Sequence, residues 1–345
     1  MKPLIKPPRL RPGDRVAIVC PSSGIAGDAE NRARFDRALR RLENEFALRP
    51  VVMENALKGS RYLWEHPEKR GEDINAAFAD PEIKGVIAVT GGDDGIRVLP
   101  YVDIDLIGAN PKIFTGLSDV TSAHYFCLKA GLGSFYGASL FSDFDGEGPM
   151  LPYTKQWIVR ELFESGPVGE IAPATGWIGR AARGLDNAQV LRRLQPHRGY
   201  RLLQGQGRAQ GRLLGGCLEV VYSLRGTPLF PAAEEFEDVI LFLETSPLCP
   251  RAWVIEDFMR SLGAAGILER LSGLLLGRPL DGKRSEEYDA AIVKVLGEYG
   301  RSDLPVLADM SFGHNAPRAL IPFGALGQID CDKRAFIIPE AVTEG

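Results

Sequence analysis

Three residues of this sequence have the types that serine-based acyl transfer needs, and each follows a short apolar run. Ser118 comes after one run, Glu244 ends a second and His314 comes after a third. A serine hydroxyl becomes a nucleophile when a histidine takes its proton, and a carboxylate fixes the tautomer of that histidine. Each residue taken alone also has a non-catalytic interpretation: a serine in a turn, a carboxylate at the end of a strand and a histidine in a loop. The combination of the three is what makes acyl transfer a hypothesis.

The turn around Ser118 has the local pattern of an exposed nucleophile. An apolar strand stops at Gly116, the serine follows two residues later, and Asp119 opens a predicted helix. This layout lifts a hydroxyl out of a sheet, and it leaves unpaired N–H groups at the helix start that can hold an anion. Val120 stands where the full G-x-S-x-G pattern has its second glycine, which argues against an α/β-hydrolase.

Only four histidines are present, so a base for Ser118 is sought by elimination. His124 lies six residues further along the predicted helix and, at about 100° per residue, points to another face. His66 and His197 lie in a charged and an irregular segment, where we expect them on the surface. His314 follows a predicted strand between small neighbours and is the remaining candidate.

The segment Gly91-Gly92-Asp93-Asp94 follows another predicted strand. It fits neither pattern of a phosphate-binding loop, and its two carboxylates would repel phosphate. Two interpretations stay open. The backbone N–H of Gly92, together with that of Asp119, forms an oxyanion hole, or the segment is a plain tight turn. No group of His, Cys and Asp has metal-ligand spacing, so we expect no metal and no cofactor.

Strands and helices alternate along the chain, which predicts an α/β fold with mostly parallel sheets. We expect strands near residues 15–20, 49–53, 86–90, 113–116, 211–217, 238–244, 271–276 and 305–307, and a terminal hairpin within 319–339. We expect helices near 28–45, 69–79, 153–163, 218–224, 252–262 and 288–299, and a further helix that opens at Asp119. Ligands gather beyond the carboxyl ends of such strands, so Gly92 and Ser118 are expected on one edge of a sheet.

The length of 345 residues predicts two domains. The pattern is poor over residues 166–207, which we interpret as a linker. Residues 1–165 then form an N-terminal α/β domain whose mostly parallel sheet is flanked by helices. Residues 208–345 form a C-terminal α/β domain that carries the acid and the base.

The amino-acid composition of the chain limits which partners and which cellular compartment we expect. The net charge of −4 gives no reason to expect nucleic acid or an anionic membrane as partner. No apolar stretch approaches the roughly 20 residues that span a bilayer, and Met1–Leu10 lacks an apolar signal core, so we expect a cytoplasmic protein. The five scattered cysteines predict small buried side chains, with no disulfide framework or zinc site.

In this order, the motifs resemble the LD-carboxypeptidase family of serine peptidases, which includes muramoyl-tetrapeptide carboxypeptidases and microcin C immunity-type peptidases. The resemblance covers nearly the whole chain. The segments that carry it are Arg11-Pro12-Gly13-Asp14, Pro21-Ser22-Ser23, Gly91-Gly92, Gly116-Leu117-Ser118-Asp119-Val120-Thr121, Leu214-Gly215-Gly216, Phe242-Leu243-Glu244 and Phe312-Gly313-His314.

The resemblance implies a role for each candidate residue. The family's nucleophile falls on Ser118, its acid on Glu244 and its base on His314, and its oxyanion donors fall on the backbone of Gly92 and Asp119. It also implies two joined α/β domains with the active site at their interface, often as a homodimer.

The implied activity is hydrolysis of an amide between an L-centre and a C-terminal D-residue, such as D-alanine on a murein tetrapeptide. Segments 91–94, 111–121, 135–137 and 215–217 look closer to the microcin immunity branch, which cleaves peptidyl or aminoacyl-nucleotide conjugates. Leu117 replaces a common aromatic of the tetrapeptidases, and Cys217 replaces a usual asparagine. A third hypothesis is a non-catalytic protein that binds a small ligand between two domains, for which we expect an export signal and no nucleophile–base set.

Overall fold

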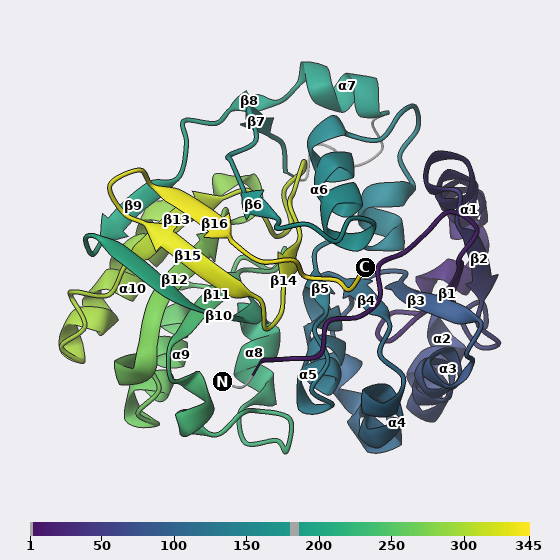
Figure 1. Cartoon of the computed structure of the whole chain (residues 1–345), viewed down its shortest axis with the longest axis horizontal. Helices are drawn as coiled ribbons and strands as arrows, with labels where there is room; N and C mark the ends of the chain where they lie inside the picture. Colours follow the sequence, from purple (N-terminus) through teal and green to yellow (C-terminus); the bar gives the residue numbers. More distant parts are fainter. Residues whose placement is uncertain (1–2, 180–185) are drawn as a thin grey trace.

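The computed structural model describes residues 3–179 and 186–345, which form two sheets flanked by helices (Figure 1). The first sheet has the order β14-β5-β4-β3-β1-β2. Its strands are β1 (Arg15–Val19), β2 (Arg49–Val52), β3 (Ile83–Ala88), β4 (Ile113–Gly116), β5 (Phe135–Tyr136) and β14 (Ile321–Pro322). All neighbours in it are parallel except β14, which runs antiparallel to β5.

The second sheet has the order β6-β16-β15-β10-β11-β12-β13-β9. Its strands are β6 (Gly169–Glu170), β9 (Arg201–Gln204), β10 (Arg208–Cys217), β11 (Val239–Glu244), β12 (Leu271–Gly277), β13 (Val306–Met310), β15 (Leu326–Asp330) and β16 (Ala335–Ile338). The four central strands β10 to β13 are parallel, and the outer strands are antiparallel to their neighbours. A two-stranded ribbon pairs β7 (Gly176–Trp177) with β8 (Gln195–Pro196).

Helices cover both sheets (Figure 1). They are α1 (Arg32–Phe46), α2 (Ser60–Glu65), α3 (Pro67–Ala79), α4 (Ile104–Ala109), α5 (Thr121–Lys129), α6 (Pro152–Leu162), α7 (Asn187–Arg192), α8 (Leu218–Leu224), α9 (Ala252–Ala264) and α10 (Ser285–Glu298). Helix α1 shows why such segments are helical: Phe35, Ala38, Leu42 and Phe46 recur every three or four residues and are all buried. The opposite face carries charged residues.

The predicted α/β class is confirmed, because both sheets are rich in parallel strands and carry helices on their faces. Every residue of β11 is buried, as expected for a central parallel strand. Some boundaries differ from the pattern. Helix α1 begins at Arg32, after two short 3₁₀ turns. Strand β3 begins at Ile83, three residues before the predicted start; the prediction began late because the exposed Lys84 interrupts the apolar run.

Segment 166–207, predicted as a linker, supplies β6 and β9, the two edge strands of the second sheet. It also supplies the β7–β8 ribbon and α7, and residues 180–185 of it lie outside the described part of the chain. The predicted terminal hairpin is formed by β15 and β16. The same C-terminal stretch places β14 in the first sheet, so the last part of the chain belongs to both sheets.

Within the described residues, no helix is long and apolar enough to cross a membrane. All five cysteines are free thiols, and four of them are buried, as their scattered positions predict; Cys249 is partly exposed.

One carboxyl group of the core lacks hydrogen-bond partners. Glu161 on α6 is 0% exposed, and neither of its carboxyl oxygens has a partner among the described residues. Burial raises the pKa of Glu161 well above its usual range, because the charged form cannot be solvated there. The folded protein therefore holds a proton that the unfolded chain releases above its ordinary pKa, so this residue destabilises the fold increasingly as pH rises.

We expect Glu161→Gln to remove this pH-dependent penalty. At pH 4 to 5 the variant and the wild type should unfold at similar temperatures. With rising pH the variant should become more stable, by up to about 1.4 kcal/mol per pH unit until the folded-state pKa of Glu161 is reached. Thermal unfolding followed by circular dichroism from pH 4 to 8 measures this. Glu164→Gln, which changes an exposed carboxylate on the same stretch, should not alter the pH dependence; parallel curves for Glu161→Gln and wild type would contradict the interpretation.

Candidate active site

Ser118 occupies a strained turn between β4 and α5. Its φ of +68° is uncommon for a residue with a side chain, and such strain persists only where the surroundings enforce it. Here the Ser118 N–H donates to the Tyr136 hydroxyl at 3.2 Å, and the Ser118 carbonyl accepts from Thr121 Oγ1 at 2.6 Å. The side chain stays partly exposed. The turn thus holds the hydroxyl outside the sheet, as the sequence pattern predicts.

The Gly91–Gly92 segment packs directly on this turn. A Cβ added at Gly91 would lie 2.6 Å from Ser118 Cβ and 3.0 Å from Asp119 N, so only glycine allows the approach. In the part of the chain that the structure describes, neither the Gly92 N–H nor the Asp119 N–H donates a hydrogen bond. Within those described residues, the donors without a partner are thus the N–H that follows Ser118 and the N–H that follows Gly91, the residue packed on the turn.

The side chain of Asp119 holds the Ser118 turn in place through two hydrogen bonds. Its Oδ2 accepts from Ser22 Oγ at 2.5 Å and from Gly95 N–H at 2.6 Å, which ties the loops after β1 and β3 to the turn. Burial raises the pKa of Asp119, against the two hydrogen bonds that lower it. Because the carboxyl is engaged and buried, only the backbone of Asp119 is free to act on a ligand.

Glu244 and His314 form a close pair at the other side of the site. Glu244 ends β11 with 0% of its side chain exposed, and its Oε2 lies 2.7 Å from His314 Nδ1. Gly313 makes this contact possible: its φ is +92°, and a Cβ there would lie 2.7 Å from Glu244 Oε2. A carboxylate on Nδ1 leaves the other ring nitrogen of His314 for proton transfer.

Tyr136 connects the two halves of the site. Its hydroxyl donates to Glu244 Oε1 at 2.5 Å and accepts from the Ser118 N–H. The structure therefore links Ser118, Glu244 and His314 in one hydrogen-bonded chain, although no hydrogen bond joins Ser118 Oγ to the His314 ring among the described residues. The sequence pattern predicts no catalytic role for Tyr136. The signal that could have indicated one is a tyrosine within an apolar strand, because a buried hydroxyl needs a hydrogen-bond partner.

A buried ion pair anchors the loop that carries His314. Arg318 Nη1 lies 3.0 Å from both carboxyl oxygens of Asp143, and Arg318 Nε donates to the Asn315 carbonyl at 3.1 Å. The two charged side chains are 5% and 4% exposed. Asp143 belongs to the segment after β5, so this pair fixes the histidine loop to the first half of the chain.

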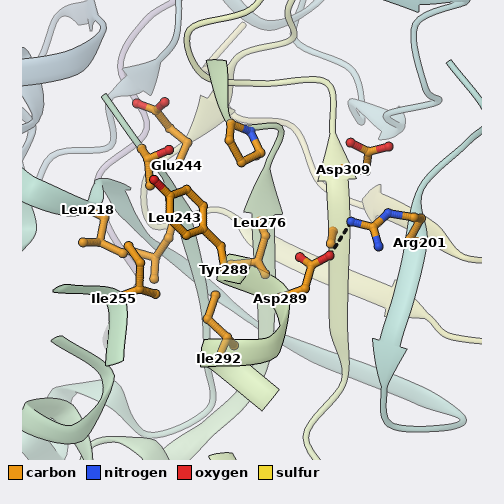
Figure 2. A pocket seen from close by; sticks show the side chains of 14 residues that line it. Arg201, Leu218, Leu243, Glu244, Ile255, Leu276, Tyr288, Asp289, Ile292 and Asp309 are labelled. Atoms are coloured by element: carbon orange, nitrogen blue, oxygen red, sulfur yellow. Dashed lines mark hydrogen bonds and ion pairs between the residues drawn. The ribbon is translucent and has the colours of Figure 1, made fainter. Parts of the chain in front are cut away.

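Glu244 also borders an apolar cavity between the second sheet and its helices (Figure 2). Five of its fourteen lining residues are leucine or isoleucine, from β11, β12, α8, α9 and α10, and Tyr288 projects into it. The Arg201–Asp289 ion pair closes the far side. Apolar surroundings of this kind lower the local dielectric constant, which strengthens the hydrogen bonds of Glu244 to its two partners.

The other histidines lie elsewhere. His124 is buried and bonds to Ser134 Oγ and the Gly116 carbonyl, so it faces away from the Ser118 hydroxyl as predicted. His66 is 43% exposed, which confirms its surface position. The same prediction is wrong for His197: its side chain is 2% exposed because its ring nitrogens bond to the Ala174 and Asp309 carbonyls. Residues 3–179 and 186–345 contain no cluster of three or more His, Cys, Asp or Glu arranged to hold a metal ion.

Two models of known protein domains match this chain. Residues 16–137 match the model of the LD-carboxypeptidase N-terminal domain, and residues 210–329 match that of the C-terminal domain. The chain belongs to the LD-carboxypeptidase family. It is accordingly a serine-type peptidase, and the resemblance seen in its motifs is confirmed.

Relatives and solved structures of the family are similar over nearly their whole lengths. The microcin C7 self-immunity protein MccF of Escherichia coli is 27% identical, over 98% of this chain and 96% of its own. A Bacillus subtilis protein named a probable murein peptide carboxypeptidase is 28% identical, over 99% and 96%. The crystal structure of an MccF-like protein from Streptococcus pneumoniae in complex with AMP is 30% identical and covers 94% of this chain and 98% of that one, with a TM-score of 0.84.

The two residues that depart from the tetrapeptidase pattern are both buried beside the site. Leu117 is 3% exposed next to Ser118, and Cys217 is 1% exposed at the end of β10, in register with Glu244. The Cys217 N–H donates to Thr121 Oγ1 at 3.0 Å. Burial raises the pKa of the Cys217 thiol well above its usual range, so it behaves as a small neutral side chain here.

We expect Arg318→Met to destabilise the protein by about 3–5 kcal/mol, because it leaves the buried Asp143 carboxylate without its charged partner. Urea unfolding at pH 7 measures the change. Arg284→Met is the matched control, since it removes an arginine whose ion pair with Glu287 is exposed, and it should cost less than about 1 kcal/mol. Equal effects of the two substitutions would show that the buried pair does not anchor the histidine loop.

Proposed function

We propose that this protein is a serine carboxypeptidase in which Ser118 is the nucleophile, His314 the general base and Glu244 the residue that orients the histidine. The hydrogen bond of 2.7 Å between Glu244 Oε2 and His314 Nδ1, linked through Tyr136 to the Ser118 turn, is the observation that supports it most. These groups supply the three functions that acyl transfer to a serine requires.

In this mechanism the free ring nitrogen of His314 takes the proton of Ser118 Oγ as the oxygen attacks the scissile carbonyl. The N–H groups of Gly92 and Asp119 stabilise the negative oxygen of the tetrahedral intermediate. His314 then gives its proton to the leaving amine, and an acyl-enzyme remains. Water, deprotonated by the same histidine, hydrolyses the ester and regenerates the serine. Glu244 stays ionised and stabilises the imidazolium in both steps.

The substrate we propose is a small peptide with a C-terminal D-residue, and the reaction releases this residue from an amide with an L-centre. D-alanine on a murein tetrapeptide is the example that the family description and the murein peptide carboxypeptidase relative support. The protein would then act in the recycling of peptidoglycan.

A second substrate class has specific support. The MccF-like protein from Streptococcus pneumoniae, which has 30% identity and near-complete coverage, was crystallised in complex with AMP. The alternative substrate is accordingly a peptidyl or aminoacyl-nucleotide conjugate, cleaved by the same residues. Leu117 and Cys217 lie beside the proposed nucleophile and acid without being either of them. We therefore expect these two replacements to affect which substrate is bound, and not the mechanism of hydrolysis.

We also propose that the protein acts in the cytoplasm and forms a homodimer. Five free thiols, four of them buried, suit a reducing compartment. Sedimentation at micromolar concentration tests the dimer.

We expect Ser118→Ala to reduce the release of D-alanine from a murein tetrapeptide by about three orders of magnitude or more, since the acyl-enzyme can no longer form. Mass spectrometry of the products measures the reaction. Ser223→Ala, which removes a hydroxyl bonded within its own helix, should keep the wild-type rate. Undiminished release by Ser118→Ala, with an unchanged circular dichroism spectrum, would contradict the proposal.

The two substrate classes are separated by comparing kcat/KM for the tetrapeptide and for an aminoacyl-nucleotide conjugate on one enzyme preparation. We expect the tetrapeptide to have the higher value, and we expect both activities to disappear in Ser118→Ala, because one nucleophile serves both. A higher value for the conjugate would replace the first substrate class with the second. Turnover of neither by the wild type would overturn the proposed function.

A further inference from the structure

Tyr136 lies where the two sheets of the molecule meet. Strand β5 has only two residues, and Tyr136 pairs in register with Gly116 of β4 on one side and with Ile321 of β14 on the other. Strand β4 leads directly to Ser118, and β14 follows the loop that carries His314. Figure 1 shows β5 and β14 at the side of the first sheet that faces the second sheet. The backbone of Tyr136 thus borders both segments that deliver the proposed nucleophile and base.

The hydroxyl of Tyr136 is fully engaged. It donates to Glu244 Oε1 at 2.5 Å and accepts the Ser118 N–H at 3.2 Å, and the residue is 0% exposed. The second oxygen of Glu244 bonds to His314. A single buried hydroxyl therefore contacts the backbone of the nucleophile and the carboxylate that holds the base.

The surroundings keep this hydroxyl in the role of a donor. Burial and the nearby charge of Glu244 raise the pKa of the Tyr136 phenol well above its ordinary value. The other titratable groups that face it are neutral near pH 7: burial raises the pKa of the Cys217 thiol, and burial lowers the pKa of the His124 ring to about 4. The His124 ring packs against that of Tyr136 with 5.6 Å between centroids. The Tyr136 hydroxyl therefore keeps its proton and donates it to one oxygen of Glu244, whose other oxygen bonds to His314.

We propose that Tyr136 is a positioning residue of the peptidase, which fixes the Ser118 backbone to the Glu244 carboxylate and sets how strongly that carboxylate retains a proton on His314. A hydrogen bond to a carboxylate stabilises its charge and makes it a weaker acceptor for a neighbouring donor. With Tyr136 on Oε1, Glu244 orients His314 but holds the imidazolium less tightly. This inference rests on the proposed roles of Ser118, Glu244 and His314.

The substitution Tyr136→Phe isolates the hydroxyl, because the ring keeps its packing against His124 and against Phe242, whose ring centroid lies 5.8 Å away. A matched control is Tyr125→Phe. Tyr125 is also fully buried, on α5, but its hydroxyl has no hydrogen-bond partner among the described residues. Both variants lose one buried oxygen, and only the first loses contacts to the proposed catalytic groups.

The first measurement is the NMR titration of the histidine rings, which needs no substrate. Four histidines are present, and the signal of His314 is identified as the one that is missing in His314→Gln. In Tyr136→Phe, we expect the His314 ring to titrate at a pH higher by on the order of one unit, as loss of one charge-assisted hydrogen bond implies. Tyr125→Phe should titrate as the wild type does. A titration of His314 that does not move in Tyr136→Phe would overturn the proposal.

The second measurement is the pH dependence of kcat/KM for D-alanine release. Tyr136→Phe should lower kcat by about tenfold or more with a smaller change in KM, since the Ser118 backbone loses its anchor. The acidic limb of its profile should shift to higher pH by the same amount as the NMR titration. A lower rate with an unmoved acidic limb shows a structural role only and overturns the proposal. Wild-type protein that releases no D-alanine refutes the proposed function instead, while the NMR result still decides the effect of Tyr136 on His314.

Discussion

A carboxylate inside a protein is tolerated only when its oxygens are paired, and Glu244 meets this requirement with partners from different parts of the chain. Its side chain is 0% exposed, Tyr136 bonds to one oxygen and His314 to the other. Tyr136 belongs to the first sheet, whereas Glu244 belongs to the second. The two sheets must therefore close on each other before this charge is stabilised. The hydrogen bonds of Glu244 are therefore complete only where the two sheets pack together.

The same closure explains the strained turn at Ser118. A φ of +68° is unfavourable in isolation, and it is held by the Tyr136 hydroxyl, by Thr121 Oγ1 and by the glycine segment that lies against the serine. Each of these groups is in place only in the folded protein. The energy that fixes the turn is thus supplied by the surrounding structure, which leaves two backbone donors and a hydroxyl in a fixed geometry. Such an arrangement does not need to reorganise when charge develops.

The candidate residues could be named from the sequence because each has a local signature. Buried parallel strands leave continuous apolar runs, and a polar side chain just past such a run stands out, as Ser118, Glu244 and His314 do. The fold class followed from the same alternation of strands and helices and is confirmed. What local patterns did not show was the exchange between the sheets: β14 has two residues, and pairing with β5 depends on residues about 185 positions away in the chain. The buried position of His197 was missed for the same reason.

By itself, the sequence determined the α/β class, the residue types available for acyl transfer and membership of the LD-carboxypeptidase family, because apolar periodicity and short motifs are local properties of the chain. The tertiary structure decided which groups touch. It placed Tyr136 between Ser118 and Glu244, it paired Arg318 with Asp143 beneath the histidine loop, and it made edge strands of a segment without a clear pattern. These contacts join residues far apart in the chain, and they are selected by the burial of charge and backbone polar groups when the two sheets pack together.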